Sequence, residues 1–122
     1  MTDFINKPRG EQIADYMADL SLCVWESMRG FFLAKKILLC PPDTCAGDDG
    51  RIMLSWSMGP HYLECEILPA GYVEYFYLNA DTDGVWGDTC THGTPFTDEV
   101  FDHLEHFAVT SAQPWGDAQE MP

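Results

Sequence analysis

Lysine and arginine are scarce in this 122-residue chain, which has six of them against 20 aspartates and glutamates and a formal net charge of −14. All six lie in residues 1–51, and residues 52–122 have none. Because Lys and Arg side chains are what neutralise phosphates, the scarcity argues against direct binding to DNA or RNA. The negative potential also argues against binding to an anionic membrane, and it attracts a basic protein partner.

The chain also lacks any apolar run of the roughly 20 residues that a membrane-spanning helix needs. Its first residues have neither the basic start nor the apolar segment of a signal peptide, so we expect a cytoplasmic protein. An odd number of cysteines in such a chain predicts free thiols and no disulfide framework. The cysteines are Cys23, Cys40, Cys45, Cys65 and Cys90.

The apolar content is high enough for a folded core. Hydrophobic residues make up 46% of the chain, and four Trp, five Tyr and seven Phe are among them, which is far more than an acidic disordered protein has. The length predicts a single domain, residues 1–122. Residues 111–122 show no periodicity and predict a flexible tail.

A helix is predicted for residues 8–28, where apolar side chains recur every three or four positions. They are Ile13, Met17, Leu20, Val24 and Met28. Gly30 either ends this helix or is absorbed by it. Residues 31–39 are compatible with more helix or with a separate apolar segment, in the core or at an interface, and the periodicity does not decide between them.

From residue 52 on, the apolar period changes to two, which predicts strands with one buried face. Three strands are expected at residues 52–58, 62–68 and 72–78, and a short fourth at residues 85–89, with glycine-containing turns between them. Residues 40–50 contain two prolines and two glycines and predict an irregular surface connection. The pattern is typical of an antiparallel meander.

A second helix is predicted after Thr94, which suits an N-cap, and Pro95, which suits the first helical position. Its apolar stripe consists of Val100, Phe101, Leu104, Phe107 and Ala108. The predicted fold is therefore α+β: an N-terminal helix, an antiparallel meander of three to four strands and a C-terminal helix, with the helices packed on the sheet.

Four features of the meander carry a resemblance: a strand ending in Trp (Ile52–Trp56), an alternating Leu-Glu strand (Leu63–Ile67), a Pro-x-Gly turn (Pro69–Gly71) and an aromatic strand (Val73–Tyr77). Together they span about a quarter of the chain. This order resembles that of small, acidic, largely uncharacterised bacterial and mobile-element proteins. The resemblance supports the fold and implies no active site. In size and charge the chain is also similar to phage-encoded inhibitors of host defence, including anti-CRISPR proteins, which would act in the host cytoplasm.

Acidic side chains are the main functional signal. Glu64, Glu66 and Glu74 are expected to share the solvent face of the meander, with no lysine or arginine nearby to offset their repulsion. The other candidate residues lie near the turns or on the second helix: Asp81, Asp83, Asp88, Asp98, Glu99, Asp102 and Glu105. Two interpretations stay open: a solubility surface, or a face that binds a basic partner at sites where Lys and Arg normally hold phosphates.

Metal and thiol chemistry are the alternatives. His61, Cys65, Cys90 and His92 are of the types that bind zinc, but their spacing matches no common zinc pattern. Cys90, His92 and Asp88 have the side chains of a nucleophile, a base and an orienting acid, although neighbours in a strand usually diverge.

The remaining cysteines and histidines have simpler interpretations. Cys40 and Cys45 lack redox or zinc spacing and are interpreted as free surface thiols. His103 and His106 are expected on a solvated helix face. We expect no catalytic residue, no metal and no cofactor.

The sequence therefore predicts a non-enzymatic inhibitor that occupies a basic, nucleic-acid-binding surface of a host defence protein. A housekeeping or antitoxin-like interaction module is the alternative, and a metal- or thiol-dependent enzyme is a third. Phe76 and Leu78 share a strand face with Glu74, so the second face of the sheet is expected to be covered by the second helix, the N-terminal segment or a partner chain, a second copy included.

Overall fold

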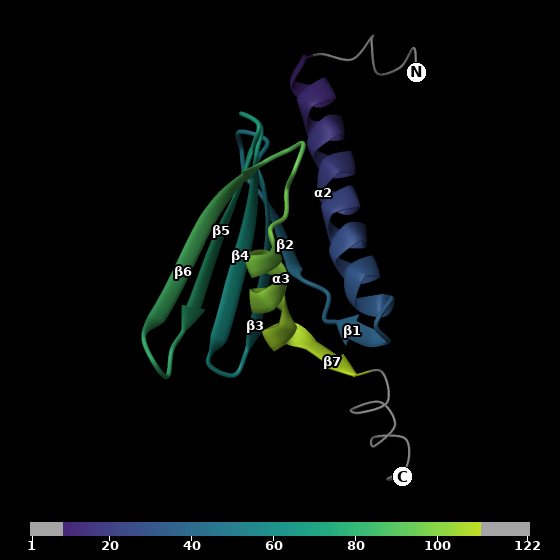
Figure 1. The fold of residues 1–122 in the computed structure, drawn as a ribbon. Helices are drawn as coiled ribbons and strands as arrows, with labels where there is room; N and C mark the ends of the chain where they lie inside the picture. The colour runs from purple at the N-terminus through teal and green to yellow at the C-terminus, as the bar shows by residue number, and fades with distance from the viewer. Residues whose placement is uncertain (1–8, 111–122) are drawn as a thin grey trace, which may run out of the picture.

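The computed structural model describes residues 9–110 (Figure 1). The elements in chain order are α2 (Arg9–Leu33), β1 (Ile37–Leu39), β2 (Asp43–Ala46), β3 (Ile52–Met58), β4 (His61–Leu68), β5 (Tyr72–Asn79), β6 (Gly84–Thr91), α3 (Asp98–Leu104), a 3-10 turn (Glu105–Phe107) and β7 (Ala108–Thr110). The α+β class, with a helix before and after an antiparallel sheet, is confirmed. The predicted tail of residues 111–122 lies outside the described residues.

α2 follows the predicted helical spacing. Met17, Val24 and Met28 are buried, because side chains three to four residues apart share the face that meets the sheet. Ile13, at the start of the stripe, stays 39% exposed. The buried face of α2 therefore begins about one turn later than the sequence pattern predicts.

Residues 31–39 are partly helix and partly strand. Gly30 is absorbed by α2, which continues to Leu33 and buries Phe32. Lys36 then adopts a left-handed backbone with φ of 62°, and the strand β1 follows. The segment is thus divided between the last turn of the helix and a short strand.

The main sheet has five antiparallel strands in the order β2-β3-β4-β5-β6, so the predicted count of three to four is wrong. The missed strand is β2, which pairs with β3 from Asp43 opposite Ser55 to Ala46 opposite Ile52. All four residues of β2 are exposed. Because an exposed edge strand has no buried face, it leaves no alternating apolar pattern to detect.

The predicted hairpin turns are confirmed between the central strands. Gly59 (φ 58°) and Gly71 (φ 108°) supply the left-handed backbone of the β3–β4 and β4–β5 turns. In the β5–β6 turn Asp83 takes this conformation, with φ of 58°, which aspartate tolerates better than most residues. These turns set the register of the four consecutive strands β3 to β6.

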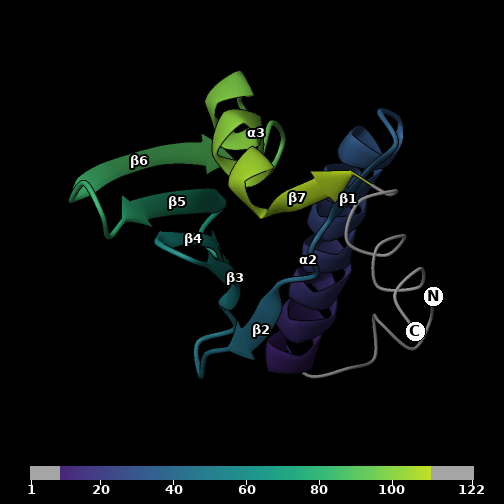
Figure 2. The ribbon, with the colours of Figure 1, turned by 90° about the horizontal axis from the view of Figure 1, so that it is seen from below.

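Both helices lie on the concave side of the curved sheet (Figure 2). Every second side chain of each strand points to this side, where a single core forms. The sheet contributes Leu54, Trp56, Leu63, Cys65, Ile67, Val73, Tyr75, Tyr77 and Cys90, and α3 with its following turn contributes Val100, Leu104 and Phe107. Of the three covers expected for the second face of the sheet, the second helix is therefore wrong.

We call the face that both helices leave uncovered the outer face. It carries the alternate side chains of the strands, whose partners the register gives. They are Asp43, Cys45, Met53, Ser55, Ser57, Tyr62, Glu64, Glu66, Leu68, Tyr72, Glu74, Phe76, Leu78, Val85, Thr89 and Thr91.

The start of α3 differs from the prediction. The N-cap is Thr97, whose hydroxyl accepts a hydrogen bond from the backbone N–H of Val100 at 3.4 Å, and not Thr94. The carbonyl of Pro95 instead accepts a 2.6 Å hydrogen bond from the Tyr75 hydroxyl. This contact with the sheet fixes Pro95 before the helix, so α3 begins three residues after the position that the local sequence favours.

The end of α3 also differs from the prediction. The apolar stripe predicted a helix through Ala108, but the helix ends at Leu104 and β7 begins at Ala108. β7 pairs with β1 in a separate antiparallel ribbon, with Leu39 opposite Ala108. This pairing joins the end of α2 to the end of α3.

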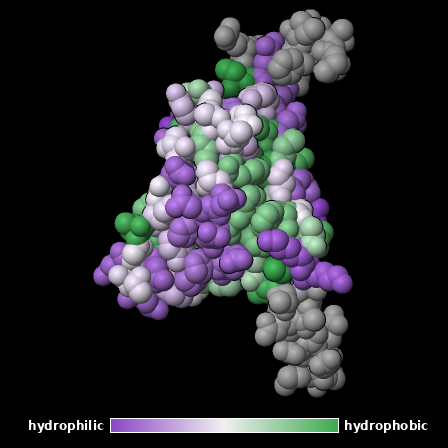
Figure 3. Space-filling model, viewed as in Figure 1, coloured by the Kyte–Doolittle hydropathy of each residue, from purple (hydrophilic) through white to green (hydrophobic). Residues whose placement is uncertain are grey.

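Polar side chains gather over α3, and an apolar band lies between α3 and α2 (Figure 3). Aromatic stacking contributes to the contact between the helices, since the rings of Phe31 and Phe101 have centroids 4.0 Å apart and Phe96 packs beside Phe101. No helix within residues 9–110 is long and apolar enough to cross a membrane.

Candidate functional site

Carboxylates and rings are neighbours on the outer face. The β4–β5 register places Glu66 opposite Glu74 and Glu64 opposite Phe76. Glu74 also has Tyr72 and Phe76 as its same-face neighbours along β5, because side chains two apart in a strand point to one side. The alternation thus brings three of the predicted acids onto one surface together with aromatic side chains.

The outer face is also partly apolar. Tyr72 is 50%, Phe76 40% and Val85 66% exposed. Leu68 lies opposite Tyr72, and Leu78 lies opposite Val85. Single exposed apolar side chains are ordinary, but neighbouring ones on adjacent strands form a patch of the kind that binds partners.

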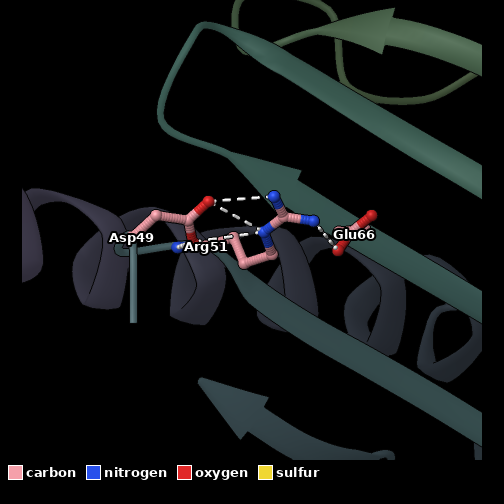
Figure 4. A network of polar contacts seen from close by, with 3 residues as sticks. All are labelled: Asp49, Arg51 and Glu66. Atoms are coloured by element: carbon pink, nitrogen blue, oxygen red, sulfur yellow. Dashed lines mark hydrogen bonds and ion pairs between the residues drawn. The ribbon is translucent and has the colours of Figure 1, made fainter. Parts of the chain in front are cut away.

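Arg51 lies at one end of this surface, between two acids (Figure 4). Its Nη1 is 2.9 Å from Oε2 of Glu66, its Nη2 is 2.9 Å from Oδ2 of Asp49, and its Nε donates to the same Asp49 carboxylate. The guanidinium holds the pKa of Asp49 below its usual range, and the two acids raise the pKa of Arg51. The expectation that no cation lies near the three glutamates is therefore wrong for Glu66.

Within residues 9–110, Glu64 and Glu74 have no such cation. Among the ion pairs of residues 9–110, none includes either of them. Glu64 accepts a 2.8 Å hydrogen bond from the Tyr62 hydroxyl. Partial burial, followed by this bond, raises the pKa of Tyr62 to about 12, so Tyr62 is a neutral donor at physiological pH. Two carboxylates on the outer face thus remain available to an external cation.

Three other predicted site residues lie elsewhere on the sheet. Asp81 and Asp83 are in the β5–β6 turn, where the side chain of Asn79 accepts a hydrogen bond from the backbone N–H of Asp81. Asp88 is opposite Tyr75 and so points to the helix-covered side. These acids shape a turn and one edge of the sheet, and they do not extend the outer face.

The acids of α3 and of the 3-10 turn that follows it are on the other side of the sheet from Glu64. Asp98, Glu99, Asp102 and Glu105 are all exposed, and Asp98 and Glu99 occupy the first turn of α3, where they stabilise the helix dipole. The ten predicted residues therefore do not form one surface, because α3 packs on the side opposite to the outer face.

The four zinc-type residues are not brought together. Cys65 is buried in the core, where burial raises the pKa of its thiol to about 12. His61 stacks on His106, whereas His92 contacts Leu68 and Tyr16. Within the described part of the chain no three His, Cys, Asp or Glu side chains are placed to hold a metal ion. All five cysteines are free thiols.

The proposed triad of Cys90, His92 and Asp88 is not assembled either. The Nε2 of His92 lies 2.8 Å from the carbonyl of Leu68, and its Nδ1 lies 3.2 Å from the Tyr16 hydroxyl, so both ring nitrogens have other partners. Burial, followed by the charge of Asp88, raises the pKa of Cys90. A raised thiol pKa lowers the fraction of reactive thiolate.

Sequence reasoning missed a histidine cluster. His61 and His106 stack with ring centroids 4.0 Å apart, and Nδ1 of His61 lies 2.6 Å from the Tyr77 hydroxyl. His103 packs between the rings of Tyr77 and Trp86 and is half-buried, so its expected place on a solvated face is wrong. The helical spacing of His103 and His106 was visible in the sequence, but the contact with His61 on β4 was not.

No protein-family model matches the chain, and neither a curated protein nor a solved structure matches it significantly. The resemblance to small acidic bacterial proteins and the similarity to phage inhibitors therefore stay predictions.

Proposed function

We propose that this protein is a non-enzymatic binding protein whose outer face binds a basic surface of a partner protein. The observation that carries the proposal is the pairing of the two cation-free carboxylates, Glu64 and Glu74, with the exposed rings of Tyr72 and Phe76 on a sheet face that the described elements leave uncovered. Such a face offers both charge complementarity and apolar area.

We further propose that the basic surface is one that normally binds nucleic acid, in a host defence protein, and that the chain acts as an inhibitor by occupying it. Carboxylates form the same charge-assisted hydrogen bonds with Lys and Arg as phosphates do. The net charge of −14 supports the idea, since a strongly negative field steers a basic partner toward the protein and also keeps nucleic acid away from it.

An antitoxin-like or housekeeping module is the second candidate, favoured by the exposed apolar side chains of Val85 and Phe76. A partner bound mainly through those side chains would resist salt, because apolar contacts are not screened. Salt dependence thus separates the two candidates.

The test is capture of partners from a bacterial lysate by the tagged protein at about 0.1 M and about 0.5 M salt, a range over which surface charges become screened. Two variants are compared with the wild type: an outer-face variant (Glu64→Gln with Glu74→Gln) and a helix-face variant (Asp102→Asn with Glu105→Gln). Both remove two negative charges, and the second removes them from the opposite side of the molecule.

We expect the wild type and the helix-face variant to capture an identified nucleic-acid-binding protein at low salt, and the outer-face variant to lose it. Added nucleic acid should displace the captured protein. Capture that survives high salt and the outer-face substitutions would contradict the charge-based function and favour the apolar module.

A further inference from the structure

The outer face has features that distinguish between the two basic side chains. Glu64 faces Phe76 across the β4–β5 pair, and Glu74 lies between Tyr72 and Phe76 along β5. Directly opposed side chains have Cβ atoms about 5 Å apart, so a carboxylate and a ring on this face can contact one cation together. Each carboxylate without an internal cation therefore has an exposed ring beside it.

Arginine fits such a pair better than lysine. Its planar guanidinium stacks on a ring and donates parallel hydrogen bonds to a carboxylate at the same time. The lysine ammonium is a compact charge that is more strongly hydrated and cannot form both contacts in one plane. A surface of alternating rings and carboxylates is hence selective for arginine.

The structure already contains one arginine bound by carboxylates. The guanidinium of Arg51 already lies at this face, where it bridges Glu66 and Asp49 with four distances of 2.9–3.1 Å. Glu64 and Glu74 present carboxylates on the same face as Glu66, but no arginine of the described residues pairs with them. They also have the rings of Phe76 and Tyr72 beside them, which Glu66 does not face directly.

We propose that the outer face recognises an arginine-rich segment of its partner, with guanidinium groups placed between Glu64 and Phe76 and between Glu74 and Tyr72. The inference rests on the proposed function, because it assumes that this face binds a basic protein. It adds the chemistry of the partner, since a lysine-rich segment of equal charge would bind more weakly.

The experiment measures binding of two fluorescent peptides of equal length, an oligo-arginine and an oligo-lysine, to the full chain at about 0.15 M salt. We expect the arginine peptide to bind about five- to tenfold more tightly, because a guanidinium can stack on a ring and donate hydrogen bonds to the neighbouring carboxylate at the same time. A double variant, Tyr72→Leu with Phe76→Leu, keeps an apolar strand. It should weaken binding of the arginine peptide more than binding of the lysine peptide, so that the two peptides then bind about equally. Thermal unfolding of each variant confirms that it is folded.

If the wild type binds both peptides equally and the outer-face variant binds neither, the arginine inference is overturned and the proposed function still stands. Binding that is weakened in the helix-face variant and unchanged in the outer-face variant would overturn both. An arginine preference that survives replacement of both rings would also overturn the inference, because the selectivity would then have another source.

Discussion

His103 shows how a single side chain can depend on its tertiary surroundings. Its Nδ1 is buried and has no hydrogen-bond partner among the described residues. Burial lowers its pKa, although the charges of Asp102 and Glu99 oppose the change. For His106, burial lowers the pKa, and the nearby His61 and His103 lower it further. Protonation of this cluster in the folded state is thus disfavoured.

A pH dependence of stability follows from the lowered pKa values of His103 and His106. Because both folded-state pKa values lie below the unfolded value of about 6.5, the unfolded chain binds more protons and stability falls as the pH decreases through that value. We expect urea unfolding to give a lower free energy of unfolding at about pH 5.5 than at about pH 7.5, a range above the titration of most carboxylates. In His103→Phe, which keeps a ring between Tyr77 and Trp86, this decrease should be smaller.

The control is His92→Gln, which removes a histidine that lies outside the cluster, beside Tyr16 and Leu68. A decrease in His103→Phe as large as in the wild type would contradict the assignment of the pH dependence to this cluster. The histidines are visible in the sequence. Whether their pKa values are raised or lowered depends on burial between β4, β5, β6 and α3, which no local pattern describes.

At the scale of elements, most of the secondary structure was predictable and its ends were not. The periodicity identified α2 and the four strands from Ile52 to Thr91, because each has a buried face that leaves a period in the sequence. β2 has no buried face, and β1 and β7 are three-residue strands that exist by pairing with each other. Such strands are defined by their partners and not by their own composition.

The cap of α3 provides a matched test at this scale. Thr97→Ala removes the hydroxyl that accepts from the backbone N–H of Val100 and should lower the free energy of unfolding by about 1 kcal/mol. Thr94→Ala, at the position that the sequence favours, should change it by less than about 0.5 kcal/mol, because Thr94 is exposed and its hydroxyl contacts that of Thr91. Urea unfolding of both variants measures the difference.

An equal loss in both variants, or a larger loss in Thr94→Ala, would contradict the placement of the cap. The sequence favours Thr94 because proline follows it. The structure uses Pro95 to bind Tyr75 instead, and this tertiary hydrogen bond overrides the local preference.

At the scale of the whole molecule, the negative charge is a cost to folding as well as a means of binding. A net charge of −14 brings many carboxylates together when the chain becomes compact. Among residues 9–110, ion pairs offset Glu26, Asp49 and Glu66, while the outer face and α3 keep most of theirs uncompensated.

Salt should therefore stabilise the protein. Raising sodium chloride from about 0.05 M to about 0.5 M should increase Tm by a few degrees, which corresponds to roughly 1 kcal/mol, because the added ions screen the repulsion. The increase should be smaller in both the outer-face and the helix-face variants, each of which carries two fewer charges. A Tm that does not change with salt in the wild type would show that repulsion is not a significant cost.

The sequence by itself determined the α+β class, the helical face of Met17, Val24 and Met28, and the shared strand face of Glu64, Glu66 and Glu74, because period and alternation are local properties. Only the tertiary structure decided that both helices cover the same side of the sheet and neither covers the outer face, that the acids of α3 lie on the opposite side, and that Arg51 compensates Glu66. Those relations join residues distant in the chain, and they depend on which packing buries the most apolar surface, which no single segment encodes.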